Sequence, residues 1–262
     1  MNKAIPPLAS SGIGPHIVYE DHLLLVIDKP ANLLVHPTGP GRPETLWDEL
    51  KRLLAFEIVN GAQVSLINRL DRETSGLTLV AKSTESARQL GLMMVRHRIQ
   101  KIYTAIAFGW PPDDAFTVNQ PLLRQGTVQP SKIWLKQMIH PDGAPAETVF
   151  EVTRRFTIRE RQFALVAARP KTGRTHQIRV HLAYAGHPIV GDKIYGPDEN
   201  CYLEFIASGW TSELSEKLLL SRQALHASAL CFEYEGRKFD LRSKIPADMS
   251  EFIGRSENLG CQ

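Results

Sequence analysis

Apolar residues alternate with polar ones, or form short runs, over much of this chain, and both patterns are typical of β-strands. Short turns such as Asp21-His22 and Glu235-Gly236-Arg237 separate neighbouring runs, which predicts hairpins. The segments expected to form strands are residues 17–20, 23–27, 33–35, 77–81, 102–108, 149–157, 163–168, 227–234 and 238–241. Strands should therefore dominate, and most of them should pair antiparallel.

Fewer segments have the spacing of a helix. Thr45 and Asp48 resemble a capping box ahead of leucines that would share one helix face. Ser83 should cap a second helix that runs to Val95. A last helix is expected over residues 247–253.

A further helix is expected to begin at Thr175 as its cap and to end near Gly186. Glycine at that position, with Pro188 beyond it, forms a stop signal. Residues 197–221 suggest an inserted helical segment, whereas residues 122–143 fit no element clearly.

Together these elements predict an α+β fold with a mixed, mainly antiparallel sheet and flanking helices. Residues 1–16 are expected to be a flexible N-terminal lead-in. Residues 17–262 should form a single domain, because no linker, repeat or low-complexity segment interrupts them.

The composition is that of a globular protein, with 262 residues and a hydrophobic content of 43%. No apolar run approaches the ~18–20 residues that span a bilayer, and residues 1–14 lack the pattern of a signal peptide. The three cysteines are widely spaced and form no Cys-x-x-Cys pair, which argues against a zinc knuckle or a disulfide framework. We therefore expect a cytoplasmic location and no membrane contact.

The net charge is only +3, from 31 basic and 28 acidic residues, and does not by itself indicate a nucleic-acid partner. Basic residues nevertheless gather over residues 96–101 and 169–181. Such clusters can neutralise phosphates while the whole domain stays near neutral. The alternative is an ordinary solvated face.

Residues 68–77, Asn-Arg-Leu-Asp-Arg-Glu-Thr-Ser-Gly-Leu, place the carboxylate of Asp71 between Arg69 and Arg72. Nearby positive charge favours the ionised form of a carboxylate. An ionised aspartate ahead of a strand is a candidate nucleophile or base. A surface ion-pair loop explains these ten residues equally well.

A second polar run covers residues 169–182. On the expected helix, Thr175, Arg179 and Leu182 would share a face, and Arg174 and Thr175 would lie at the N-terminus, where backbone N–H groups favour anions. With His176 beside them, these residues could grip a phosphate or a carboxylate. A basic helix that covers its own core is the alternative.

Two other polar side chains have an ordinary and a functional interpretation. Tyr103 could be a strand aromatic, or a platform on which a base stacks. His226, in the run Leu225-His-Ala, is more typical of a half-buried histidine than of a catalyst.

Taken in order, these runs resemble the RluA-type pseudouridine synthases over residues 17–242. The resemblance rests on the runs Asn68-Arg-Leu-Asp-Arg-Glu-Thr-Ser-Gly, Lys101-x-Tyr-x-Ala, Gly173-Arg-Thr-His-Gln-Ile-Arg-Val-His, Gly186-His-Pro-Ile-Val-Gly-Asp and Leu225-His-Ala. The opening run Asp28-Lys-Pro-Ala-Asn-Leu-Leu-Val-His-Pro is similar too. Several ordered motifs are far more specific than any one of them.

The resemblance implies an RNA-modifying isomerase with a central active-site cleft. It implies that Asp71 is the catalytic aspartate and that Arg69 enters the helical stack as the target uridine leaves. Tyr103 would pack against the uracil, Arg179 would pair with the aspartate, and Leu225 would line the uracil pocket.

Two departures from the family pattern qualify this picture. The motif usually begins His-Arg-Leu-Asp, and here Asn68 stands first, so altered support or altered RNA contact is expected rather than lost activity. Some members carry an N-terminal S4 RNA-binding domain, and we expect none here, because few residues precede residue 17.

The implied reaction gains no atoms or electrons, so it requires no metal and no cofactor. The expected partner is a structured stem-loop of ribosomal RNA or tRNA, not DNA, and we expect a monomer. A glycosidic-bond hydrolase and a non-enzymatic RNA-binding module are the alternatives. The first usually needs a second acidic partner, for which only Glu73 is near, and the second does not need the carboxylate.

Overall fold

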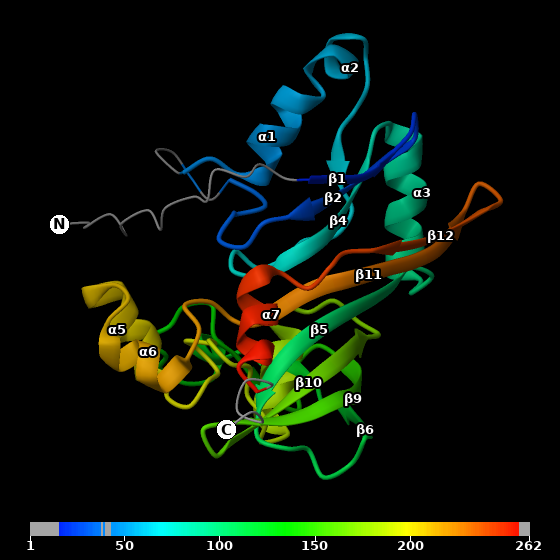
Figure 1. The fold of residues 1–262 in the computed structure, drawn as a ribbon. Helices are drawn as coiled ribbons and strands as arrows, with labels where there is room; N and C mark the ends of the chain where they lie inside the picture. The colour runs from blue at the N-terminus through cyan, green and yellow to red at the C-terminus, as the bar shows by residue number, and fades with distance from the viewer. Residues whose placement is uncertain (1–15, 38, 40–42, 257–262) are drawn as a thin grey trace. The chain divides into compact units, whose positions relative to one another are not determined.

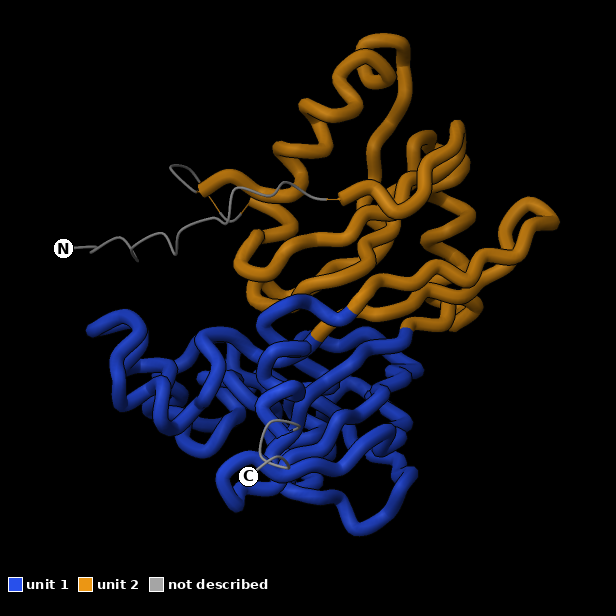
Figure 2. Tube along the Cα trace, viewed as in Figure 1, with its two compact units in different colours: residues 1–7, 102–225, 245–262 blue, residues 8–101, 226–244 orange. Residues whose placement is uncertain are grey.

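The computed structural model describes residues 16–37, 39 and 43–256, and they form two compact units (Figures 1 and 2). Among the described residues, unit 1 contains residues 102–225 and 245–256. Unit 2 contains the described residues up to 101 and residues 226–244. Most of the predicted lead-in lies outside the described residues, and the prediction of a single catalytic domain stays a prediction.

Unit 2 is built on the central strand β4 (Ser75–Ala81), every residue of which is buried. β2 (Leu24–Lys29) runs antiparallel to β4 and pairs in turn with β1 (His16–Glu20). The short β3 (Ser65–Leu66) also pairs with β4. β11 (Leu225–Tyr234) begins parallel to β4 and forms a hairpin with β12 (Arg237–Arg242).

Three helices accompany this sheet, α1 (Leu46–Leu53), α2 (Ala55–Val59) and α3 (Thr84–Val95). Leu90 of α3 packs into a core with Leu77 and Leu79 of β4 and with Phe232 and Phe239 of the β11–β12 hairpin. Because these apolar side chains come from distant segments, burying them together fixes which strands become neighbours.

Both predicted helix caps of unit 2 are confirmed. The Asp48 carboxylate accepts hydrogen bonds from the backbone N–H of Thr45, at 3.0 Å, and from its hydroxyl, at 2.7 Å. The Ser83 hydroxyl accepts a hydrogen bond from the N–H of Ser86 at 3.1 Å, and the N–H of Ser83 donates to the Ser86 hydroxyl at 3.1 Å. These local bonds satisfy amides that a helix start leaves without partners.

The predicted strand over residues 33–35 is wrong. Leu34 forms only an isolated bridge with Thr45. The carbonyl of Leu33 instead accepts a hydrogen bond from the Lys29 ammonium at 3.0 Å, so it is diverted from a strand ladder.

Unit 1 contains an antiparallel set of strands in the order β5, β10, β9, β6 (Figure 1). Their bounds are β5 (Gln100–Phe108), β10 (Arg161–Pro170), β9 (Glu147–Ile158) and β6 (Ala115–Asn119). Phe163 of β10 packs edge-on against Phe252, with ring centroids 5.2 Å apart. Phe252 comes from α7 (Ala247–Gly254), so the last helix closes this core.

A second small sheet of unit 1 joins β7 (Leu122–Arg124) to β8 (Gln137–Ile139), with a 3-10 turn at Gln125–Thr127. This is the stretch that the sequence pattern left unassigned. The predicted helical segment is confirmed as α5 (Asn200–Ser208) and α6 (Ser212–Leu218), which lie together in Figure 1.

The expected helix cap at Thr175 is wrong. Helix α4 runs Gln177–Tyr184, and its N-cap is His176, in the left-handed region at φ 57°. The Gln177 side chain accepts bonds from the N–H of Arg174, at 3.0 Å, and from the Thr172 hydroxyl, at 2.6 Å. These bonds hold residues 172–176 as a turn, so Thr175 precedes the helix and shares no helix face with Arg179.

The predicted fold class is confirmed: an α+β protein with a mixed, mainly antiparallel sheet. The β4–β11 pair is parallel, while β1–β2, β2–β4, β9–β10 and β5–β10 are antiparallel. Within the described ranges, no helix has the length and apolar character needed to cross a bilayer.

Candidate active site

Asp71 lies in a tight turn immediately before β4. The N–H of Thr74 donates to the Asp71 carbonyl at 3.1 Å, which closes the turn. Leu70 and Thr74 are buried on either side, whereas Asp71 is half-buried and Arg69 is exposed. The turn therefore buries its apolar and hydroxyl side chains, while Asp71 stays half-buried and Arg69 stays exposed.

A fully buried lysine supports this turn. The Lys29 ammonium donates to the carbonyls of Pro30 at 2.8 Å, Leu33 at 3.0 Å and Arg72 at 3.2 Å. A buried ammonium needs such partners, because losing its hydration without them is costly. Lys29 thereby ties the loop after β2 to the Asp71 turn. It lies in the Asp28-Lys-Pro run noted from the sequence, but its supporting role was missed.

Asn68, the departure from the family pattern, is buried beside β4. Its side-chain amide donates to the Leu77 carbonyl at 3.2 Å, and its carbonyl oxygen accepts from the N–H of Leu79 at 2.7 Å. Asn68 thus forms hydrogen bonds with both a carbonyl and an N–H group of the β4 backbone. Neither of these partners is charged, so these contacts do not require a charged side chain.

Two of the sequence motifs meet where β4 and β11 begin. Ser75 and Gly76 pair with His226 and Ala227, and the Ser75 hydroxyl lies 3.0 Å from Nδ1 of buried His226. Gly76 has φ 113°, and a Cβ there would lie 2.4 Å from the Ala227 carbonyl oxygen. Only glycine allows this close approach. The Thr-Ser-Gly run on β4 and the Leu-His-Ala run on β11 therefore pair with each other where the two strands begin.

In unit 1, Arg179 forms a buried ion pair with Asp192. Its Nε and Nη2 lie 2.6 Å and 2.9 Å from the two carboxylate oxygens, and Asp192 also accepts the N–H groups of Ile194 and Tyr195 at 3.0 Å. Burial alone would raise the pKa of Asp192, but the Arg179 guanidinium and the two N–H groups lower it below its ordinary value. Asp192 belongs to the noted Gly186-to-Asp192 run, yet its pairing with Arg179 was not predicted.

Tyr195 connects Arg179 to His176. The Arg179 guanidinium carbon lies 5.0 Å from the centre of the Tyr195 ring, and the Tyr195 hydroxyl is 2.8 Å from Nδ1 of His176. The N–H of Gln137 donates to the same hydroxyl at 2.8 Å. The fold thus brings together two of the predicted site residues through an aromatic side chain that the sequence had not singled out.

The other basic residues of this region have mixed surroundings. Arg174 donates to the Pro145 carbonyl at 3.1 Å and is exposed, as is Thr175. Arg169 pairs with Glu151 at 2.7 Å. Burial lowers the pKa of His181, whose Nδ1 lies 3.0 Å from the Thr148 hydroxyl. Some basic residues of segment 169–181 therefore form internal contacts and others are exposed, so the segment is not one uniform cationic face.

Tyr103 and Leu225 belong to the core of unit 1. Tyr103 pairs with Ala168 across β5 and β10 and packs, partly buried, against the same cluster that contains buried Leu225. Asp71 and Arg69 are in unit 2, so the predicted pairing of Arg179 with Asp71 stays a prediction.

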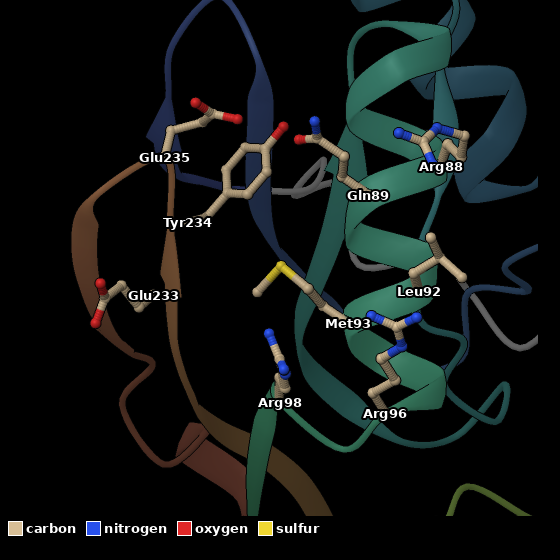
Figure 3. Close-up of a pocket in the computed structure, with 9 residues that line it drawn as sticks. All are labelled: Arg88, Gln89, Leu92, Met93, Arg96, Arg98, Glu233, Tyr234 and Glu235. Carbon is tan, nitrogen blue, oxygen red and sulfur yellow. The ribbon is translucent and has the colours of Figure 1, made fainter.

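The basic cluster at residues 96–101 borders a separate hollow of about 300 Å³ in unit 2. Figure 3 shows Arg96 and Arg98 there beside α3, with Glu233 and Glu235 on the other side. Arg88, also in the lining, pairs with Glu85 at 2.7 Å. The charges of this hollow largely balance, so it does not resemble an anion site.

Comparison with known proteins agrees with the motifs. Residues 23–184 match the family described as RNA pseudouridylate synthase. The chain is 35% identical over 246 residues to the ribosomal large subunit pseudouridine synthase D of Haemophilus ducreyi, covering 91% of this chain and 69% of the relative. It is 36% identical over 245 residues to the protein of that name from Salmonella typhimurium, covering 90% and 69%.

Solved structures share the fold. The human RNA pseudouridylate synthase domain containing 4 superposes with a TM-score of 0.69 at 25% identity, covering 92% of this chain and 93% of that one. The human RNA pseudouridylate synthase domain containing 1 superposes with a TM-score of 0.65 at 23% identity, covering 88% of this chain and 83% of that one. The chain belongs to the RNA pseudouridylate synthase family, as an RluA-type isomerase that acts on RNA.

Proposed function

We propose that this enzyme converts specific uridines of large-subunit ribosomal RNA to pseudouridine, with Asp71 as the catalytic nucleophile. The observation that carries the assignment is the Asp71 turn, half-exposed at the start of a fully buried strand and tied down by buried Lys29. The two relatives are named as ribosomal large subunit pseudouridine synthases, which favours ribosomal RNA over tRNA as the substrate.

The reaction breaks the N1–C1′ bond of uridine, turns the uracil and forms a C5–C1′ bond. The proton on C5 is lost and N1 gains one, so the product is an isomer. The Asp71 carboxylate would attack C1′, or stabilise the positive charge that develops there. Preorganised charge of this kind is among the largest contributions to catalysis. In this proposal Arg179 orients the carboxylate, and Tyr103 packs against the uracil.

The target base must leave its stack before the aspartate can reach C1′. Flipping costs a few kcal/mol, which a wedge and a pocket can offset. Arg69 is exposed and suits the wedge, while Leu225 would form an apolar wall of the pocket. Arg174, Thr175 and His176 would contact the RNA backbone near the flipped nucleotide.

Tritium release tests this proposal. Transcripts of large-subunit ribosomal RNA and of tRNA, labelled with tritium at uridine C5, are incubated with wild type, Asp71→Asn and the matched control Asp142→Asn. Asp142 is an aspartate whose side chain is 87% exposed, outside the proposed site. We expect release from ribosomal RNA with wild type and the control, and none with Asp71→Asn.

Other outcomes contradict the proposal in different ways. Free uracil would indicate hydrolysis of the glycosidic bond. Release from tRNA alone would move the substrate to tRNA. Undiminished release by Asp71→Asn would show that this aspartate is not required for catalysis. Separately, mapping pseudouridine in the product RNA identifies the modified nucleotide.

A further inference from the structure

The most exposed tryptophan of unit 1 is held in a preorganised basic loop. Trp134 is 74% exposed, and the guanidinium carbon of Arg124 lies 4.0 Å from the centre of its ring. Leaving a large aromatic in water forgoes the stabilisation that burial would give. An exposed ring stacked on a guanidinium therefore offers its other face to a ligand.

The loop around Trp134 is fixed by hydrogen bonds. The N–H of Gln125 donates to the Lys136 carbonyl at 2.8 Å, and the N–H of Lys136 donates to the Ile133 carbonyl at 3.1 Å. The Ser131 hydroxyl donates to the same Ile133 carbonyl at 2.9 Å. Little ordering of the loop would be required when a ligand binds.

This loop is anchored directly to the Arg179 cluster. Ile133, next to Trp134, is buried with Val180 and Tyr195 in one apolar cluster. The N–H of Gln137 donates to the Tyr195 hydroxyl, the group that lies 2.8 Å from His176. Trp134 therefore projects from the same unit as His176 and Arg179, and from a loop that is linked to both of them through Tyr195.

The charge of the segment matches an anionic ligand. Residues 120–140 include Arg124, Lys132 and Lys136 and contain no aspartate or glutamate. Lys136 forms an ion pair with Glu199, but Lys132 is exposed. Cationic side chains around an exposed aromatic are the features with which proteins bind single-stranded nucleic acid.

We propose that Trp134, stacked on Arg124 and close in sequence to Lys132, binds an unpaired nucleotide of the substrate RNA. The base would stack on the free face of the indole, while Arg124 and Lys132 would contact the neighbouring phosphates. This contact rests on the proposed function only in taking RNA as the ligand, and it uses none of the proposed catalytic residues.

Binding of fluorescein-labelled (U)12 and (A)12 RNA tests the stacking. Loss of one base–aromatic stack corresponds to between about fivefold and about 150-fold in affinity. We expect Trp134→Ala to weaken binding of both oligonucleotides about tenfold, and Trp134→Phe to stay within about threefold of wild type. The matched control is Phe56→Ala on α2, where the aromatic is 79% exposed, and it should bind like wild type.

Two further readouts separate stacking from a structural effect. RNA should quench the intrinsic fluorescence of wild type, and Trp134→Phe should lose much of that quenching while it still binds. Arg124→Gln and Lys132→Gln should each reduce the slope of log K against log salt by about 0.7, the value for one phosphate contact on a single strand.

Turnover supplies the last readout, since Trp134→Ala should raise KM about tenfold with kcat unchanged. Affinity of Trp134→Ala within twofold of wild type would overturn the inference. So would an equal loss in Phe56→Ala, or a change of oligomeric state in Trp134→Ala without a change in RNA affinity. If wild type released no tritium, the proposed function would fail while the binding experiment still decided this inference.

Discussion

Arg179 and Asp192 form a bidentate ion pair at 2.6 Å and 2.9 Å, and both side chains are buried. The pair joins helix α4 to the loop that carries Tyr195, because the same carboxylate accepts the N–H of Tyr195. Together with the bond between Tyr195 and His176, this pair brings His176, Arg179 and Tyr195 into one segment.

Asp192→Asn should destabilise the protein strongly. Removing one partner of a buried ion pair leaves the other charge uncompensated, which costs about 3–5 kcal/mol. Urea unfolding followed by circular dichroism measures the loss. Asp240→Asn is the control, because Asp240 pairs with Arg242 at the surface and its loss should change stability little. Equal stability of the two variants would contradict the structural role of the buried pair.

The stability of the protein should fall in acid partly through Asp21. Burial tends to raise the pKa of Asp21, but hydrogen bonds from the N–H groups of Leu24 and Leu23 and from Arg237 lower it to about 2. A carboxyl with a lowered pKa contributes stability above its unfolded value, and that contribution is lost as the pH falls toward the folded value.

The free-energy difference between wild type and Asp21→Asn should therefore be constant above about pH 5 and shrink between about pH 4 and pH 2. Urea titrations at a series of pH values measure it. A difference that stayed constant down to pH 2 would show that Asp21 titrates normally in the folded protein.

Lys29→Met should disable catalysis more than it disables folding. The substitution leaves the carbonyls of Pro30, Leu33 and Arg72 without their shared donor and loosens the turn that carries Asp71. Asp71 is the catalytic nucleophile in the proposed function, and misplacing such a group by about 1 Å can cost about 10²-fold in rate. We therefore expect a fall in kcat of that order with KM nearly unchanged.

Tritium release by Lys29→Met is compared with that of Lys238→Met, an exposed lysine of β12 in the same unit. A thermal melt of each variant shows whether the fold persists. Normal kcat in a folded Lys29→Met protein would argue that the buried ammonium does not position the turn.

Gly76→Ala should destabilise unit 2 by about 3 kcal/mol or more, since the new Cβ would clash with backbone and φ is positive. The clash involves the nitrogen and oxygen of Ala227, which cannot move without breaking the β4–β11 contact. Gly91→Ala in α3 is the matched control, with nothing within 4 Å of the new methyl. It should stabilise the helix by about 0.5–1 kcal/mol. Unfolding in guanidinium chloride should therefore move in opposite directions for the two variants.

Local features were predictable from the sequence alone. The helix caps at Thr45 and Ser83 and the β11–β12 hairpin each depend on residues a few positions apart, so the pattern contains the whole interaction. The ordered motifs likewise indicate the family without reference to the fold, because several rare runs in one order seldom arise by chance.

The predicted cap at Thr175 was wrong because other side chains compete for the local hydrogen bonds. Thr175 has the right side chain for a cap, but Gln177 already bonds the N–H of Arg174 and the Thr172 hydroxyl. The residue type at one position does not show which of several nearby side chains will form the local hydrogen bonds.

Tertiary structure alone decided which distant groups meet. Nothing in the spacing of Lys29 and Arg72, of Arg179 and Asp192, or of Gly76 and Ala227 shows that they touch. Those contacts follow from burying apolar strands together, which brings charged and polar groups out of water and forces each to find a partner. The sequence by itself thus determined most local elements, the family and the candidate chemistry. The packing of the core decided which side chains hold the candidate site residues in place.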